Sequence, residues 1–342
     1  MVAIPSLQFE HPVPESQVHK RAVSEVFPTD VVSIGADELW AGVRWPEHHS
    51  FYRHGPTRPD SYLLLETIRQ LTILASHDHY GAPSSARFVM SGLGMFTLPN
   101  VEEVDLHPSE VAVRLRGTEV RRKPSGALQS VSMEVEFFAG TIPFATGHGD
   151  AMIVNERVYC RLRGGRIEEH QGGGRPRGSI LSPQLVGHRD ASDVVLGGAF
   201  SSTLITLSLD LDNRILFDHP LDHIAGMIPV EATRQILRVL RSDPNNELSG
   251  AEFHYAVALE FDGEITALVR ASGDHAKVQF VQAGNVAVTG EVTVAPRVVA
   301  ANRPGSDDRE SPVRSPTVRP ESRREERKST FHELAAADLF AL

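Results

Sequence analysis

The sequence predicts an α+β fold built from two similar units, each with one long helix followed by an antiparallel sheet. Two segments, LLLETIRQ at 63–70 and IPVEATRQ at 228–235, share the pattern E-x-x-R-Q, and their glutamates lie 165 residues apart (231 minus 66). A matching lead-in segment precedes each helix, VHKRAVSEV at 18–26 and VGHRDASDVVL at 186–196. A repeat of this kind indicates two copies of one structural unit.

The period of the apolar residues changes after each repeated segment. We expect the first helix from about Asp60 to His77, apolar on most of its circumference. Beyond it, 111–120 and 130–138 alternate apolar and polar residues, as half-buried strands do. After the second helix, strands are expected in FHYAVALEF, EITALVRA, KVQFVQ and VAVTGEVTV. A single helix packed on such a sheet buries most of its own surface.

These patterns divide the chain into five parts. They are an N-terminal arm at 1–17, a first repeat at 18–157, a linker at 158–181, a second repeat at 182–298 and a tail at 299–342. The linker, with GGRIEEHQGGGRPRGS, is expected to be flexible because it is rich in glycine. The tail is charged and proline-rich, so we expect it to be disordered, with a possible short helix in FHELAAADLFAL.

Composition narrows the range of functions. The formal net charge of −10 argues against nucleic acid as a partner, because binding phosphate backbones requires a basic surface. No apolar run approaches the roughly 20 residues that a membrane span needs, and the N-terminus lacks the features of a signal peptide. The one cysteine, Cys160, argues against a disulfide framework and is typical of the reducing cytoplasm.

Each repeated helix carries a glutamate and an arginine on one face, because Glu66 and Arg69, like Glu231 and Arg234, lie three residues apart. One interpretation is a weak ion pair at the edge of the core. The apolar neighbours favour another, because burying an ion costs several kcal/mol and a pair kept twice there indicates a function. If the arginine outweighs burial, the glutamate is ionised at neutral pH and suits a general base.

The segment FDHPLDHIAG before the second helix adds three candidates. Gly226 is expected to open the helix, where its free N–H suits an oxyanion; alternatively, it permits a tight turn. His219 and His223 each follow an aspartate, which suits a proton shuttle, although a histidine in a loop is often structural. Metal binding is the weaker interpretation, because Pro220 keeps the two histidines off one helix face.

These segments, together with HSFYRHGPTRPDSYLLLETIRQ and VHKRAVSEVFPTD, resemble the AfsA-type A-factor biosynthesis family over roughly 18–294. The most specific block is D-H-P-x-D-H-x-x-G-M-x-x-x-E-A-x-R-Q. Family members are tandem hotdog-fold enzymes of actinobacteria that make gamma-butyrolactone autoregulators. The resemblance implies two units, each a central helix wrapped by a curled antiparallel sheet. It implies neither a cofactor nor a metal.

The resemblance also implies a reaction, the transfer of a 3-oxoacyl chain from acyl carrier protein to the hydroxyl of dihydroxyacetone phosphate. We expect a glutamate to take the hydroxyl proton, an arginine to hold the phosphate or keep the carboxylate ionised, and a histidine to return a proton to the thiolate. The expected catalytic residues are Glu231, Arg234, Glu66, His219 and Gly226. The expected substrate-binding residues are Arg69, Gln70, Gln235, His223 and His54.

The two repeats are not equal. In an ungapped register His54 matches His219, but Ser61 replaces Gly226 and Arg58 replaces His223. We therefore expect one main site centred on the second repeat, with the first contributing across the interface or serving as scaffold. Two units in one chain can form the usual pair, so a monomer with an internal pseudo-dimer and a homodimer are both compatible with the sequence.

An acidic carrier protein would dock on a locally basic surface. Candidates are the run at 121–123 and the linker residues Arg161, Arg163 and Arg166, with solvated turn and linker charges as the alternative. Two other functions fit the sequence: a hotdog dehydratase or thioesterase, and a non-catalytic binder of acyl or lactone ligands that regulates a partner. Nothing in the sequence resembles a DNA-binding helix-turn-helix.

Overall fold

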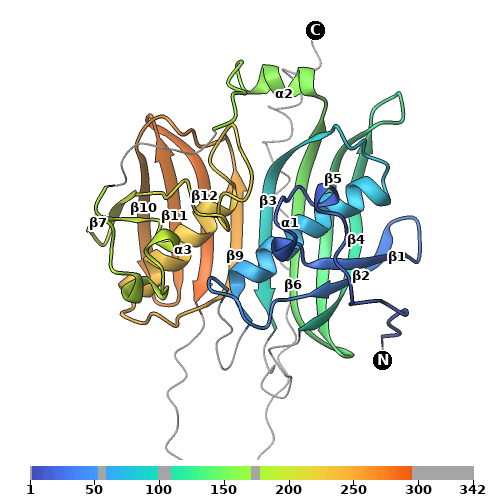
Figure 1. Cartoon of the computed structure of the whole chain (residues 1–342), viewed down its shortest axis with the longest axis horizontal. Helices are drawn as coiled ribbons and strands as arrows, with labels where there is room; N and C mark the ends of the chain where they lie inside the picture. The colour runs from blue at the N-terminus through green and yellow to red at the C-terminus, as the bar shows by residue number, and fades with distance from the viewer. Residues whose placement is uncertain (1, 53–58, 99–108, 171–177, 295–342) are drawn as a thin grey trace, which may run out of the picture. The chain divides into compact units, whose positions relative to one another are not determined.

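The two repeats share one continuous antiparallel sheet. The structure, a computed structural model, describes residues 2–52, 59–98, 109–170 and 178–294. In these ranges the strands lie in the order β1-β2-β4-β5-β6-β3-β9-β12-β11-β10-β8-β7 (Figure 1). The first six belong to repeat one and the last six to repeat two, in mirrored order. The two halves meet where β3 pairs with β9 in antiparallel register.

The strands of repeat one are β1 (Pro28–Ser33), β2 (Glu38–Arg44), β3 (Arg87–Thr97), β4 (Glu110–Arg122), β5 (Leu128–Ala139) and β6 (Ile142–Val154). Those of repeat two are β7 (Leu196–Phe200), β8 (Leu204–Leu207), β9 (Leu248–Tyr255), β10 (Ile265–Ser272), β11 (His275–Gln282) and β12 (Asn285–Val294).

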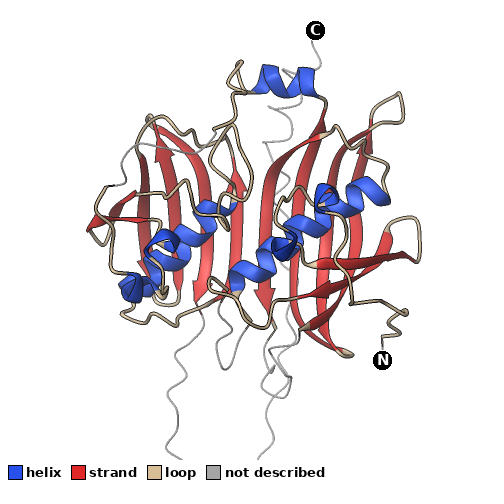
Figure 2. Ribbon diagram, viewed as in Figure 1, coloured by secondary structure: helices blue, strands red, loops and turns tan. Residues whose placement is uncertain are grey.

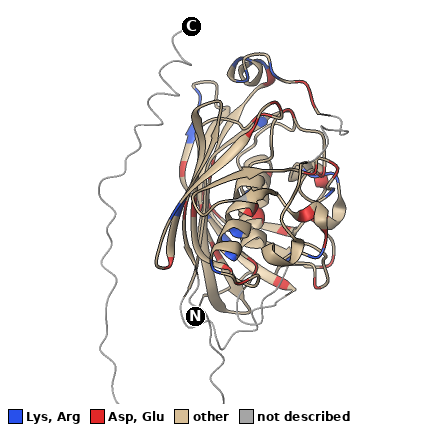
Figure 3. Cartoon of the chain, turned by 90° about the vertical axis from the view of Figure 1, so that its left-hand side faces the viewer, with Lys and Arg blue, Asp and Glu red and all other residues tan. Residues whose placement is uncertain are grey.

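One long helix lies on the same face of each half-sheet (Figures 1 and 2), and the side view shows the two layers (Figure 3). The first helix, α1 (Ser61–Asp78), begins where the Asp60 side chain accepts hydrogen bonds from the backbone N–H groups of Tyr62 and Leu63, at 2.8 and 3.1 Å. Fifteen of its 18 residues are buried, which explains its apolar circumference. The second helix, α3 (Met227–Leu240), follows Gly226. The predicted helix-then-sheet unit is confirmed in both repeats.

The structure also differs from the sequence analysis in places. The expected strand FHYAVALEF ends at Tyr255, because the chain leaves the sheet there. A short helix, α2 (Glu156–Leu162), occupies the junction between repeat one and the expected linker, and its start is capped by the side chain of Asn155. The expected tail at 299–342 lies outside the described residues. No helix of the described ranges has the length and apolar character needed to cross a membrane.

A histidine joins the two repeats where their strands meet. His148 of β6 reaches across β3 and contacts Glu252 of β9 at 2.8 Å, while its other ring nitrogen lies 3.4 Å from Asp150. The crossing requires a glycine in β3, because a Cβ at Gly94 would lie 2.5 Å from the His148 ring. Burial lowers the pKa of His148, but the two carboxylates outweigh burial and raise its pKa to about 10.

This junction predicts a specific pH dependence of stability. Because the folded pKa of His148 is raised to about 10, its contribution is fully present below the unfolded value of about 6.5 and is lost as pH rises towards 10. In thermal unfolding followed by circular dichroism, the wild type should therefore lose more stability between pH 6.5 and pH 10 than His148→Gln does. Equal losses in the two proteins would contradict the assigned role.

Candidate functional site

The two E-x-x-R-Q segments place equivalent polar clusters at equivalent points of α1 and α3. The lead-in segments match at a spacing of 168 residues (186 minus 18), three more than the helices. Lys20 of repeat one therefore corresponds to His188 of repeat two. Each contacts the glutamate of its own helix, Lys20 contacting Glu66 at 3.2 Å and His188 contacting Glu231 at 2.7 Å. The two clusters share one plan but differ in their partners.

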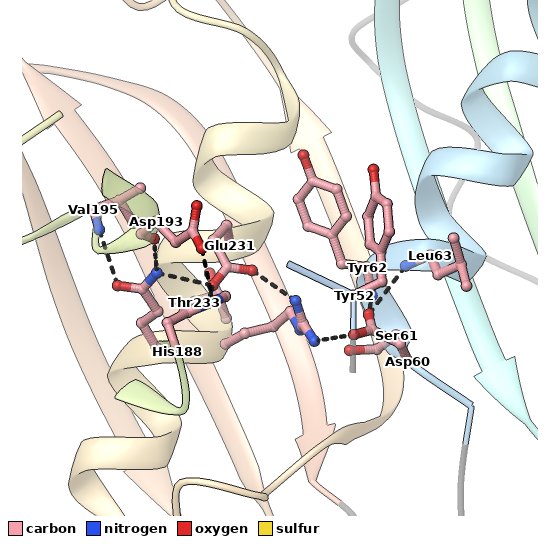
Figure 4. A network of polar contacts seen from close by, with 12 residues as sticks. Tyr52, Asp60, Ser61, Tyr62, Leu63, His188, Asp193, Val195, Glu231 and Thr233 are labelled. Atoms are coloured by element: carbon pink, nitrogen blue, oxygen red, sulfur yellow. Dashed lines mark hydrogen bonds and ion pairs between the residues drawn. The ribbon is translucent and has the colours of Figure 1, made fainter. Parts of the chain in front are cut away.

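In the α3 cluster, Arg234 is surrounded by carboxylates from both repeats. Its guanidinium donates to Glu231 at 2.6 Å, to Asp60 at 2.9 Å and to Glu247 at 3.0 Å. Glu247 also accepts from Arg238 and from the Ser61 hydroxyl. Asp60 and Ser61 stand at the start of α1, so this network ties the two helices together (Figure 4).

The α3 cluster is closed to solvent. Glu231 and Asp60 are fully buried, and Arg234 is 2% exposed. Burial raises the pKa of Glu231, but the charges of Arg234 and His188 outweigh it and hold the pKa well below the usual range. His188 and Asp193 lie behind Glu231, with their nearest side-chain atoms 3.8 Å apart (Figure 4). No cleft in the described parts of the chain is lined by Glu231 or Arg234.

In the α1 cluster, Glu66 is held by two cations. Arg69 donates to both carboxylate oxygens at 2.8 and 2.9 Å, and Lys20 approaches to 3.2 Å. Burial raises the pKa of Glu66, but Arg69 and then Lys20 outweigh it and lower the pKa to about 2. The Arg69 side chain is 17% exposed, and among the described residues its Nη1 makes no hydrogen bond. This cluster therefore keeps unused donors near solvent.

The aspartate–histidine loop of repeat two lies against this α1 cluster. Asp218 accepts from the backbone N–H of Arg21 at 2.9 Å, and its charge acts on Arg69 and on Lys20. The Asp218 carboxylate accepts a hydrogen bond from Nδ1 of His219. Burial raises the pKa of Asp218, but His219 and Lys20 outweigh it and lower the pKa to about 2.

A small hollow of about 100 Å³ opens beside the loop. It is lined by Arg87, Tyr159, Ile167, Glu169, His219, Pro220, Leu221 and Asp222. His219 is about one-third exposed, and its Nε2 forms no hydrogen bond with any residue that the structure describes. His223 is oriented by Asp222 at 2.6 Å, and Tyr159 donates to the same carboxylate.

Gly226 also faces repeat one. It opens α3 with a φ of −59°, a conformation open to any residue, so a tight turn does not explain the glycine. Tyr255 does, because its hydroxyl donates to the Gly226 carbonyl at 3.0 Å and its ring would lie 3.4 Å from a Cβ there. Burial raises the pKa of Tyr255, and the Glu66 charge adds to the rise, which places Gly226 near the α1 cluster.

These contacts correct the expected centre of the site. The sequence analysis groups His219 and Gly226 with Glu231, but the structure brings them towards Glu66 and Arg69. Helix geometry explains the difference, because five residues span about 500°, so positions 226 and 231 point about 140° apart. The arrangement pairs the loop of one repeat with the helix of the other. His54, the equivalent of His219, lies outside the described residues.

A second correction concerns Gln70 and Gln235, which we expected to bind substrate. Both are fully buried. Gln70 donates to the carbonyl of Glu25 and accepts from the N–H of Phe27, at 2.7 and 3.0 Å. Gln235 makes the same two bonds to Asp193 and Val195. Each amide therefore holds its lead-in segment to its helix.

The predicted carrier-docking arginines differ in their availability. Arg163 is 9% exposed and pairs with Asp222 and Glu260, so it supports the loop instead of facing solvent. Arg122 donates to the carbonyls of Tyr80 and Gly126, whereas Arg166 is 62% exposed. In the described ranges, no group of three or more His, Cys, Asp or Glu side chains is arranged to hold a metal ion.

Sequence reasoning did not identify the partners of the two clusters: Lys20, His188, Asp193, Asp60 and Glu247. A signal was present for Lys20 and His188, because aligning the lead-in segments with their own spacing places both beside the repeated glutamates. Lysine is also rare, with four in the chain. The contacts of Asp60 and Glu247 join the two repeats, so no local pattern could reveal them.

Comparisons with known proteins match both repeats. The model of the A-factor biosynthesis hotdog domain matches residues 3–155 and 171–314. A 2-oxo-3-(phosphooxy)propyl 3-oxoalkanoate synthase of Streptomyces virginiae is 32% identical over 233 residues, which are 68% of this chain and 78% of the relative. The protein of the same name in Streptomyces griseus is 28% identical over 227 residues, 66% of this chain and 74% of the relative.

Among solved structures, an acyl-ACP thioesterase from Bacteroides thetaiotaomicron aligns with a TM-score of 0.46 and 14% identity. The alignment covers 75% of this chain and 98% of that one. We draw no functional inference from a likeness of this size.

The two arginines should differ in their importance for stability. Arg234→Met leaves three buried carboxylates without their cation, so we expect a loss of about 3–5 kcal/mol in the free energy of unfolding. Arg69→Met should cost less, about 1–2 kcal/mol, because Lys20 still neutralises Glu66. Denaturant unfolding of the two variants measures both values, and equal losses would show that the clusters are not structurally different.

Proposed function

The chain belongs to the A-factor biosynthesis hotdog family, and from that premise we propose that it transfers a 3-oxoacyl chain from acyl carrier protein to the hydroxyl of dihydroxyacetone phosphate. The match in two segments confirms the tandem hotdog fold. The chain is an enzyme of the type that its named relatives represent. The observation that carries the proposed reaction is the Asp218–His219 pair beside the cations of the α1 cluster.

His219 fits the proton acceptor better than either glutamate does. A general base works best when its pKa lies near the working pH. The pKa values of Glu66 and Glu231 are both lowered far below neutrality, so these carboxylates have little tendency to take a proton. Histidine is the side chain most often used for proton transfer near neutral pH. We therefore assign Glu66 to electrostatic support of the site.

The Asp218 contact orients the His219 ring. A carboxylate only accepts hydrogen bonds, so the proton of the neutral imidazole lies on Nδ1, which contacts Asp218. Nε2 then carries a lone pair beside the hollow that His219 lines. A hydroxyl placed there can give up its proton while its oxygen attacks a carbonyl. The same aspartate stabilises the imidazolium that forms.

The reaction then follows in balanced steps. The acceptor hydroxyl oxygen attacks the thioester carbonyl carbon as its proton passes to Nε2 of His219. Gly226, at the N-terminus of α3, offers its N–H to the oxyanion, supported by the helix dipole. The C–S bond breaks, the leaving thiolate takes the proton from His219, and an ester and free carrier thiol result.

Two substitutions separate the roles of the clusters. In His219→Gln, acyl transfer should fall by about 10²–10⁴-fold with an unchanged melting temperature, because only the proton acceptor is removed. In Glu231→Gln, the melting temperature should fall, because the α3 network loses its central charge. Transfer is measured by mass spectrometry of the ester formed from 3-oxoacyl carrier protein and dihydroxyacetone phosphate.

A matched control is His275→Gln, which removes a ring from β11 that lines neither cluster. Retained transfer in His219→Gln would reject His219 as the base. Release of free carrier without dihydroxyacetone phosphate would indicate a thioesterase instead. An acyl carrier that stays loaded in all conditions would indicate a binding protein.

A further inference from the structure

We propose that a cationic cluster at the junction of the repeats binds the phosphate of the acceptor substrate. This cluster comprises Lys20, Arg69, His19 and Arg87. The inference rests on the proposed function for the identity of the acceptor, but its central observation, a set of unused N–H donors, is independent of the reaction.

The first step of the argument is the number of donors. Among the described residues, Lys20 contacts Glu66 alone, and Arg69 leaves its Nη1 without a partner. Arg87 uses only its Nε, to Glu156, within the same described ranges. A phosphate has three peripheral oxygens and is best held by several charge-assisted hydrogen bonds. The equivalent cluster at α3 has no such surplus, since Arg234 serves three carboxylates.

The second step is position. Arg87 and His219 line the same hollow, so a group held by Arg87 lies beside the proposed base. His19 connects this hollow to the α1 cluster. Burial lowers the pKa of His19 to about 4, and the charges of Arg69, His77, His219 and Arg87 add to the lowering. The ring is therefore surrounded by cationic and imidazole groups, a setting that favours an anion.

The third step is backbone strain at His19. Its φ is 54°, a value uncommon for residues other than glycine. In repeat two the equivalent position, 168 residues later, is Gly187, with a φ of 80°. One copy thus uses the residue that this conformation favours, whereas the other keeps an imidazole there. Strain of this kind is often retained where a side chain has a function.

The His19 ring is also held in place. Its Nε2 lies 3.1 Å from Nε2 of His77, and both rings pack on Phe88 at centroid distances of 5.1 Å. His77 Nδ1 contacts the carbonyl of Ala82 at 3.0 Å, so in neutral His77 that nitrogen carries the proton. His19 then donates from Nε2 to His77. Protonation of His19 Nδ1 would supply the further donor that an incoming phosphate requires.

Two variants test the cluster, His19→Asn and Arg87→Gln. Asparagine tolerates a positive φ, so His19→Asn keeps the backbone and removes the imidazole. We expect calorimetry to show binding of dihydroxyacetone phosphate, and of inorganic phosphate, about tenfold weaker in each variant. In the transfer assay, KM for dihydroxyacetone phosphate should rise by a similar factor with kcat little changed. Arg116→Gln is the matched control, because this exposed arginine pairs with Glu134 on the sheet.

Dihydroxyacetone without its phosphate supplies the comparison acceptor. The wild type should prefer the phosphorylated acceptor, and the preference should shrink in both variants but not in Arg116→Gln. Unchanged KM values and unchanged phosphate binding in correctly folded variants would overturn the subsite while leaving the transfer reaction intact. If no acyl transfer is found but phosphate binds the wild type and not the variants, the subsite stands and the proposed reaction fails.

Discussion

The buried guanidinium of Arg234 is the interaction on which the arrangement of the two repeats depends. It has carboxylate partners at the start of α1, on its own helix and just before β9. An ion buried without its partners costs several kcal/mol, so these three segments must come together for the fold to form. Their meeting sets the position of α3 against α1. That position in turn brings the loop ahead of α3 to the α1 cluster.

Local patterns predicted the helices and several strands well. E-x-x-R-Q marked both helices because a spacing of three residues places side chains on one helical face. Alternation marked β4 and β5, which show one buried face. It did not mark β3 and β6, whose sequences RFVMSGLGMFT and IPFATGHGDAMIV contain glycines and long apolar runs. These strands lie under α1 and near the junction, where glycines make room for Ile68, Thr72 and His148.

The site was only partly predictable, for a physical reason. The sequence correctly paired each glutamate with its arginine, because those contacts lie within one helix turn. It grouped the aspartate–histidine loop with the wrong helix, because nearness along the chain does not show which side of α3 faces the loop. The ionisation of the glutamates also depends on burial and on Lys20 and His188, which long-range packing supplies.

The pairing of β3 with β9 within one chain has a consequence for how such proteins evolve. In a two-fold assembly of identical subunits, each substitution appears twice, so both crevices must change together. Covalent fusion removes that constraint. One crevice can then be filled by Asp60 and Ser61 and become a rigid support, while the other retains its glycine and its imidazoles. Duplication followed by fusion allows one molecule to assign anchoring and chemistry to different halves.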